Sequence, residues 1–60
     1  MNRVIKILME RDDISQEHAE RLVKETRDEI MMLENPLDAD EVLADYIGLE
    51  PDYLFDVLNF

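Results

Sequence analysis

Apolar residues recur along the chain at intervals of three and four, without the apolar–polar alternation of a half-buried strand. This spacing predicts four helices, with bounds at about 2–11, from Ser15 to Asn35-Pro36, from Asp38 to Gly48, and from Pro51 onward. The connections between them are short, so successive helices should pack antiparallel or at steep angles around one core. We therefore expect an all-α fold, a small bundle of three to four short helices, in a single domain spanning residues 1–60.

The first helix has an unusually wide apolar arc. Its apolar side chains cover roughly 200° of the helix surface at ~100° per residue, more than a surface helix usually needs. Either this helix is central, or its second side meets a partner. Asp12 and Asp13 close the segment. The arc consists of Val4, Ile7 and Leu8 in line with Arg11, with Ile5 and Met9 beside them.

The second helix has the clearest beginning, because Ser15 is a good N-cap residue and Glu17 follows in the first turn. Asn35-Pro36 should end it, since the residue before a proline avoids helical geometry. Its apolar stripe consists of Ala19, Leu22, Val23, Thr26, Ile30 and Leu33. On the opposite face, acids and bases four residues apart form a predicted ladder of ion pairs: Glu17–Arg21, Glu20–Lys24, Arg21–Glu25 and Lys24–Asp28.

The third helix has two predicted signals at its start. Asp38 and Glu41 have the spacing of a capping box, and Leu37 and Val42 have that of a hydrophobic staple. Gly48 suits the left-handed position after the last turn, which lets the next residue, a leucine, fold back on the helix. The expected buried stripe consists of Ala39, Val42, Leu43, Tyr46 and Ile47.

The fourth helix is expected to begin with Pro51 at its first position. Phe55 falls outside its apolar stripe. The stripe itself consists of Tyr53, Leu54, Val57 and Leu58.

Composition limits the chemistry that the chain can perform. It has 60 residues, no cysteine and one histidine, so it forms no disulfide and is a poor candidate for a zinc site. A hydrophobic fraction of 47% is too high for a disordered acidic tail. No apolar run approaches the ~20 residues that span a bilayer, and the start of the chain lacks the pattern of a signal peptide. We therefore expect a cytoplasmic protein that does not enter membranes.

Charge is distributed very unevenly. All six lysines and arginines lie within residues 1–27, and the formal charge of −10 divides into −2 over residues 1–33 and −8 over residues 34–60. Such a surface favours cationic partners and disfavours nucleic acids and anionic lipids, whose charge it cannot neutralise.

Five carboxylates form the candidate partner-binding site. Asp38, Glu41 and Asp45 fall within roughly 60° of one another on the third helix, opposite its expected buried stripe. Asp52 and Asp56 lie four residues apart on the polar side of the fourth. One interpretation is a rigid acidic patch that binds a basic protein surface or mimics the phosphates of a nucleic acid. The other is an ordinary solvated face that keeps a small protein soluble.

The same carboxylates do not fit metal binding or catalysis. Asp38-x-Asp40 begins like a calcium-binding loop, but Val42 and Leu43 occupy the positions where an oxygen ligand and a glycine are needed. Ser15 has no base nearby, and His18 is expected to be exposed in the first turn of its helix. We therefore predict no enzyme activity, no metal site and no cofactor.

Three exposed apolar residues are candidates for self-association. Met31 and Met32 project away from the stripe of their helix, and Phe55 lies outside the stripe of the fourth. Methionine adapts to varied contact surfaces. A homodimer would bury this surplus apolar area, although the two methionines could instead cover the fourth helix.

The segment EVLADYIGLEPDYLFDVL, residues 41–58, resembles the closing part of a lambda-repressor-type helix-turn-helix domain, with the pattern L-A-x-x-L-G-x-x-P-x-Y-L. The resemblance implies that a glycine-terminated helix is followed by a proline-started one. The preceding segment departs from the family, because its bases are matched by acids. The resemblance therefore implies the local packing of these two helices but does not imply DNA binding. The matching positions are Leu43, Ala44, Ile47, Gly48, Pro51, Tyr53 and Leu54.

In length, composition and the closing GLEPDYLFDVL, the chain also resembles short acidic proteins of tailed phages and prophages. That resemblance implies an accessory protein that binds a host or phage protein. Two alternatives remain: a repressor-like DNA-binding regulator, and a structural or assembly protein that uses a homodimeric apolar interface. The first requires a basic surface free of acids, formed by Arg3, Lys6, Arg21, Lys24 and Arg27.

Overall fold

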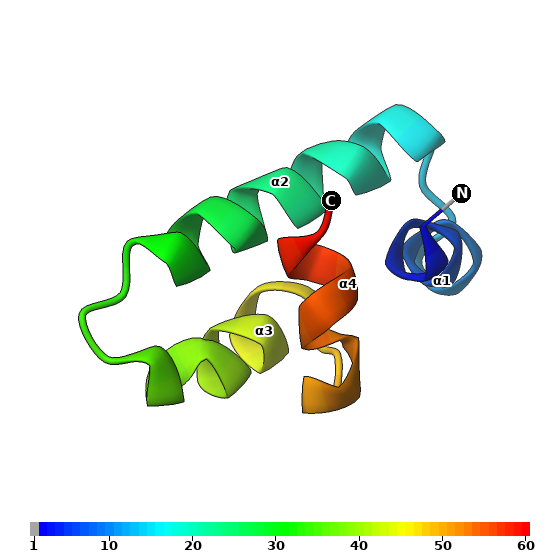
Figure 1. Ribbon diagram of the computed structural model, residues 1–60. Coiled ribbons are helices and arrows are strands. Elements are labelled where there is room, and N and C mark those ends of the chain that lie inside the picture. Colours follow the sequence, from blue (N-terminus) through cyan, green and yellow to red (C-terminus); the bar gives the residue numbers. More distant parts are fainter. Residues whose placement is uncertain (1) are drawn as a thin grey trace.

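A computed structural model describes residues 2–60 and confirms the predicted all-α fold class. Within that range the chain forms four α-helices and no strand: α1 (Arg3–Asp12), α2 (Gln16–Met31), α3 (Ala39–Ile47) and α4 (Leu54–Leu58). Two short 3-10 helices precede the last two, η1 (Pro36–Asp38) and η2 (Pro51–Tyr53). The molecule measures 32 × 17 × 17 Å, and α2 runs along its length (Figure 1).

The core forms where α2 meets the other three helices. In Figure 1, α1 lies at one end of α2, the connection to α3 lies at the other, and α4 lies between α1 and α3. Each helix contributes at least one fully buried aliphatic side chain, so the four segments share one apolar centre. Its buried members are Val4, Ile5, Leu8, Ala19, Val23, Leu43, Ile47, Leu49 and Val57.

The wide apolar arc of α1 packs against the core of the same chain. Val4, Ile5 and Leu8 are buried, and Ile7 and Met9 pack against the same core while remaining partly exposed. The helix is capped at its start by Asn2, whose Oδ1 accepts the Val4 N–H at 2.8 Å. It ends as predicted at the two aspartates, the second of which has left-handed backbone geometry, with φ 53°.

The predicted start of α2 is confirmed, and its predicted end lies too far along the chain. The Ser15 hydroxyl oxygen accepts the His18 N–H at 3.1 Å. The helix stops at Met31, ahead of the Asn35-Pro36 pair. Thr26 is buried in the predicted stripe, and its hydroxyl is satisfied there because it donates to the Leu22 carbonyl within the same helix, at 2.8 Å.

The predicted ladder of ion pairs on α2 is largely absent from residues 2–60. Glu17 and Arg21 lie 3.9 Å apart, whereas the Glu20 carboxylate accepts from Gln16, and Arg27 pairs with its neighbour Asp28 at 3.3 Å. Exposed pairs of this kind differ by only a few tenths of a kcal/mol, so the spacing alone does not select among them.

The start of α3 corrects two predictions. Asp38 makes no capping hydrogen bond, because Pro36 begins a 3-10 turn that places Asp38 in helical geometry already. Asn35 takes the capping role instead, and its Oδ1 accepts the Leu37 N–H at 3.1 Å. The staple does not form either, since Leu37 is 85% exposed while Val42 is half-buried.

The end of α3 is as predicted. Gly48 has left-handed geometry, with φ 63°, and its N–H donates to the Ala44 carbonyl at 3.0 Å. Leu49 then turns into the core that contains Leu43. The prediction that Tyr46 belongs to the buried stripe was wrong, because this side chain is 52% exposed. Pro51 starts the last segment as expected, although its first turn is the 3-10 helix η2.

Candidate functional site

Three of the five predicted site carboxylates lie on α3 and on the short 3-10 helix that leads into it. Asp38, at the end of η1, and Glu41 and Asp45, on α3, are all exposed. Their spacing of three and four places them on one face of the helix. Within residues 2–60, none of the three forms an ion pair. The face therefore presents unneutralised negative charge to solvent.

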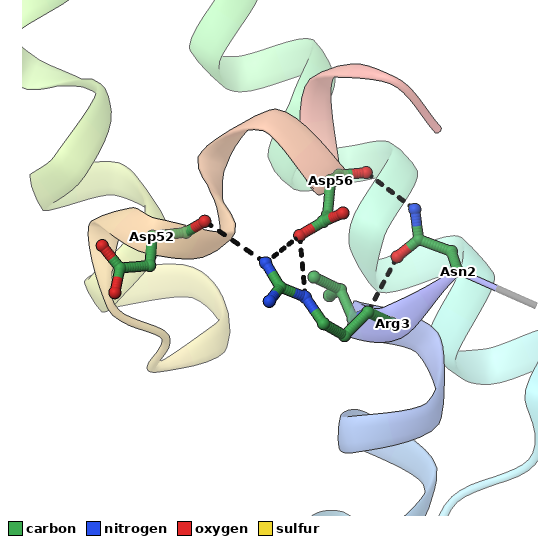
Figure 2. A network of polar contacts seen from close by, with 5 residues as sticks. Asn2, Arg3, Asp52 and Asp56 are labelled. Carbon is green, nitrogen blue, oxygen red and sulfur yellow. Dashed lines mark hydrogen bonds and ion pairs between the residues drawn. The ribbon is translucent and has the colours of Figure 1, made fainter.

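The other two predicted carboxylates differ from each other in their surroundings. Arg3 of α1 reaches across to α4, where its Nε donates to Asp56 Oδ2 at 3.0 Å and its Nη2 pairs with the same oxygen. The same Nη2 also contacts the Asp52 backbone carbonyl at 3.4 Å, while the Asp52 carboxylate points away into solvent (Figure 2). Asp56 thus forms an ion pair with a base 53 positions away, whereas the Asp52 carboxylate forms none among residues 2–60.

The contacts around Arg3 join α1 to the last helix of the chain (Figure 2). The Arg3 guanidinium lies 4.5 Å from the centroid of the Tyr53 ring, a cation–π geometry. Asn2 donates from Nδ2 to the Asp56 carbonyl at 2.8 Å. The hydrogen bond that Arg3 donates to the Asp56 carboxylate raises the pKa of the Arg3 guanidinium above its ordinary value. Sequence spacing could not reveal this cluster, because its members come from opposite ends of the chain.

A second group of acids, across α2 and α3, was missed by the sequence analysis. The pKa of Tyr46 is raised above the ordinary tyrosine value, first by the charge of Glu29 on α2 and also by those of Asp45 and Glu25. The assignment of Tyr46 to the buried stripe concealed this arrangement. The negative field of α3 therefore extends onto the neighbouring part of α2.

The bases are mostly engaged within the fold. Arg11 binds Asp12 and contacts the Gly48 carbonyl, and Arg27 contacts the Phe60 carbonyl at 3.2 Å in addition to its neighbouring aspartate. Arg3 and Arg21 also each contact a carboxylate. Among residues 2–60, no arginine pairs with a carboxylate of the acidic face of α3. Three of them contact distant parts of the chain instead: Arg3, Arg11 and Arg27.

The predicted self-association residues are exposed but come from different elements. Met31, at the end of α2, is 64% exposed and Met32 is 77% exposed. Phe55, on α4, is also 77% exposed. Leu37 adds a further exposed apolar side chain, which the predicted staple had assigned to a helix contact.

Among residues 2–60, no pocket and no group of three or more potential metal ligands is present. Within the same range, no helix combines the length and apolar character that crossing a membrane requires. Comparisons with protein-family models, with curated proteins and with solved structures find no match to this chain. The surface chemistry of the chain itself therefore supplies the argument about function.

Proposed function

We propose that this protein is a non-enzymatic interaction protein whose acidic face on α3 binds a cationic surface of another protein. The observation that carries the proposal is the grouping of Asp38, Glu41 and Asp45, exposed on one side of α3 and without an ion pair among residues 2–60. A rigid helix holds these charges at fixed separations, so a partner with matching lysines or arginines binds without ordering the face first.

The charge distribution supports a cationic protein partner. Residues 34–60 hold eight carboxylates and no lysine or arginine, and carboxylates of α2 extend the same field. Such a field speeds the approach of positively charged partners and repels negatively charged ones. A nucleic-acid-binding protein is one suitable partner, because its basic site accepts an acidic helix face in place of phosphates. The resemblance to short acidic phage proteins favours an accessory role of this kind.

The repressor-like alternative has less support. It requires the bases to form one surface free of acids, yet Arg3 contacts Asp56 on α4, Arg21 contacts Glu17, and Arg27 contacts Asp28. A phosphate backbone approaching any of these three arginines also meets the paired carboxylate.

The test is a pull-down from a cell lysate at low and at high salt, with three forms of the protein. The first is wild type, the second carries Asp38→Asn, Glu41→Gln and Asp45→Asn, and the third carries Glu10→Gln, Glu17→Gln and Glu20→Gln. The two triple variants have the same net charge, because each removes three carboxylates, but they remove them from different parts of the surface. We expect basic proteins to be captured by wild type and by the third form at low salt, and lost at high salt because exposed charges are then screened.

Capture that is equally strong with the α3 variant would overturn the proposal. Equal loss in both triple variants would show that net charge alone acts, without a defined face. Circular dichroism checks that both variants fold, and we expect the α3 variant to be at least as stable as wild type because it has less like-charge repulsion.

A further inference from the structure

We infer that the connection between α2 and α3 is an apolar docking surface for an amphipathic, cationic segment of a partner protein. The surface consists of Met31, Met32 and Leu37, and we call it the methionine corner. The inference rests on the proposed function and describes the partner of the acidic face more closely, because Asp38 adjoins both surfaces.

The methionine corner holds the most exposed aliphatic side chains described in the chain. Leu37 is 85% exposed, Met32 is 77% exposed, and Met31 is 64% exposed. All three belong to the stretch where the chain turns from α2 into η1, at the end of the molecule away from α1 (Figure 1). Three large apolar side chains left exposed around one turn are the kind of feature that marks a contact surface.

The backbone beneath the corner is held in place by local hydrogen bonds. The Met32 N–H donates to the Asp28 and Glu29 carbonyls, both at 3.2 Å, which closes α2. The Asn35 side chain accepts the Leu37 N–H, and the Asn35 carbonyl accepts the Asp38 N–H at 3.1 Å. Pro36 fixes its own φ between them. The exposed side chains are therefore presented on an ordered turn, which lowers the entropy lost on binding.

The charge around the methionine corner indicates whether a second copy of the chain or a different protein binds there. Glu34 and Asp38 are exposed within the same turn, Glu29 is exposed in the last turn of α2, and no lysine or arginine follows Arg27. A two-fold dimer on this surface would bring these carboxylates together with their own copies. A segment with apolar side chains flanked by lysine or arginine instead satisfies both features, and methionine adapts its shape to such a segment.

The probe is a synthetic helical peptide of leucine and lysine with the leucines on one face. Its control is a peptide with serine at every leucine position, so that the charge is unchanged. We expect wild type to bind the leucine–lysine peptide about tenfold or more tightly than the serine–lysine peptide, because only the former fills the corner. The chain has four methionines, so methyl NMR resolves the contact. The methyl signals of Met31 and Met32 should shift, and that of half-buried Met9 should not.

Variants locate the binding. Met31→Ser, Met32→Ser and Leu37→Ser together should reduce binding of the leucine–lysine peptide to the level of the serine–lysine peptide, with the fold intact because all three positions are exposed. Phe55→Ser is the matched control, since Phe55 is an equally exposed apolar residue on another element. It should leave binding unchanged.

Four results would overturn the inference. The first is equal affinity of wild type for the two peptides. The second is a methyl shift at Met9 in place of Met31 and Met32. The third is a concentration-dependent dimer, seen by sedimentation, that the triple serine variant loses; this would identify a second copy as the occupant. The α3 variant separates the two proposals. The fourth result is that the α3 variant has weaker binding of both peptides, by the same factor, while the triple serine variant binds both as wild type does. The acidic face then binds and the methionine corner does not.

Discussion

Tyr46 shows how a single side chain reports the charge of its surroundings. It lies half exposed on α3, and Glu29 and Glu25 of α2, together with Asp45, raise its pKa. The anionic phenolate is disfavoured near these carboxylates, so the folded protein keeps the proton to a higher pH than the unfolded chain does. The raised pKa of Tyr46 therefore contributes to the free energy of unfolding. This contribution is complete below the ordinary tyrosine pKa and is lost as pH rises through the raised pKa of the folded protein.

This pKa shift is directly measurable. In a Tyr53→Phe variant, which keeps the aromatic ring beside Arg3, Tyr46 is the one remaining tyrosine. We expect phenolate absorbance to appear at higher pH in the folded protein than in urea. Adding Glu29→Gln should lower the pH at the midpoint of the Tyr46 titration in the folded protein, because the largest source of the pKa shift is removed. Adding Glu34→Gln is the control and should leave this midpoint unchanged. Identical midpoints in the folded and unfolded states would contradict the placement of Tyr46 among these acids.

At the scale of the helix, boundaries follow from local backbone chemistry. Ser15 begins α2 by accepting an N–H, and Gly48 ends α3 with a positive φ. A Cβ at position 48 would have ordinary contacts, 3.5 Å from Arg11 Nη1 and 3.9 Å from the Ala44 carbonyl. The requirement for glycine there comes from φ rather than from lack of space.

Replacing Gly48 therefore tests the cause of the helix end. Gly48→Ala should lower the free energy of unfolding by about 1–2 kcal/mol, the usual penalty for a side chain in left-handed geometry. Gly48→Asn should lower it less, because asparagine tolerates this geometry. Urea titrations followed by circular dichroism measure both. Equal losses would instead indicate that the added atoms collide with their neighbours.

Prediction from the sequence succeeded where the determining contacts are local. The apolar spacing located all four helices, and the roles of Ser15 and Gly48 depend on bonds within four residues. It failed at the start of α3, where Asp38 and Asn35 compete as caps and the geometry of Pro36 decides. Glu41 and Asp45 are exposed on α3, as their spacing predicted, but whether they bind a partner stays a prediction. The Arg3–Asp56 pair was not foreseeable, because it depends on how α1 and α4 pack.

At the scale of the whole molecule, excess negative charge opposes folding. The formal charge is −10, and the ion pairs described here engage only some of the sixteen carboxylates. Exposed like charges repel, and this repulsion is screened by dissolved ions. The exposed attractive pairs are screened as well, but they are fewer than the unpaired acids.

Added salt should therefore stabilise the fold. We expect the thermal midpoint to rise as sodium chloride is increased from ~0.01 M to ~0.5 M, a range over which the screening length shrinks several-fold. The variant with Asp38→Asn, Glu41→Gln and Asp45→Asn should start from a higher midpoint and respond less to salt. A midpoint that falls with salt would mean that the attractive pairs dominate.

The link between Arg3 and Asp56 also bears on the order in which the structure assembles. These residues are separated by almost the whole chain, so closing the link costs the entropy of a long loop until α2 and α3 have brought the ends near. We expect the contact between α1 and α4 to form late in folding and to open early in native fluctuations. Amide hydrogens of α1 would then exchange faster than those in the middle of α2.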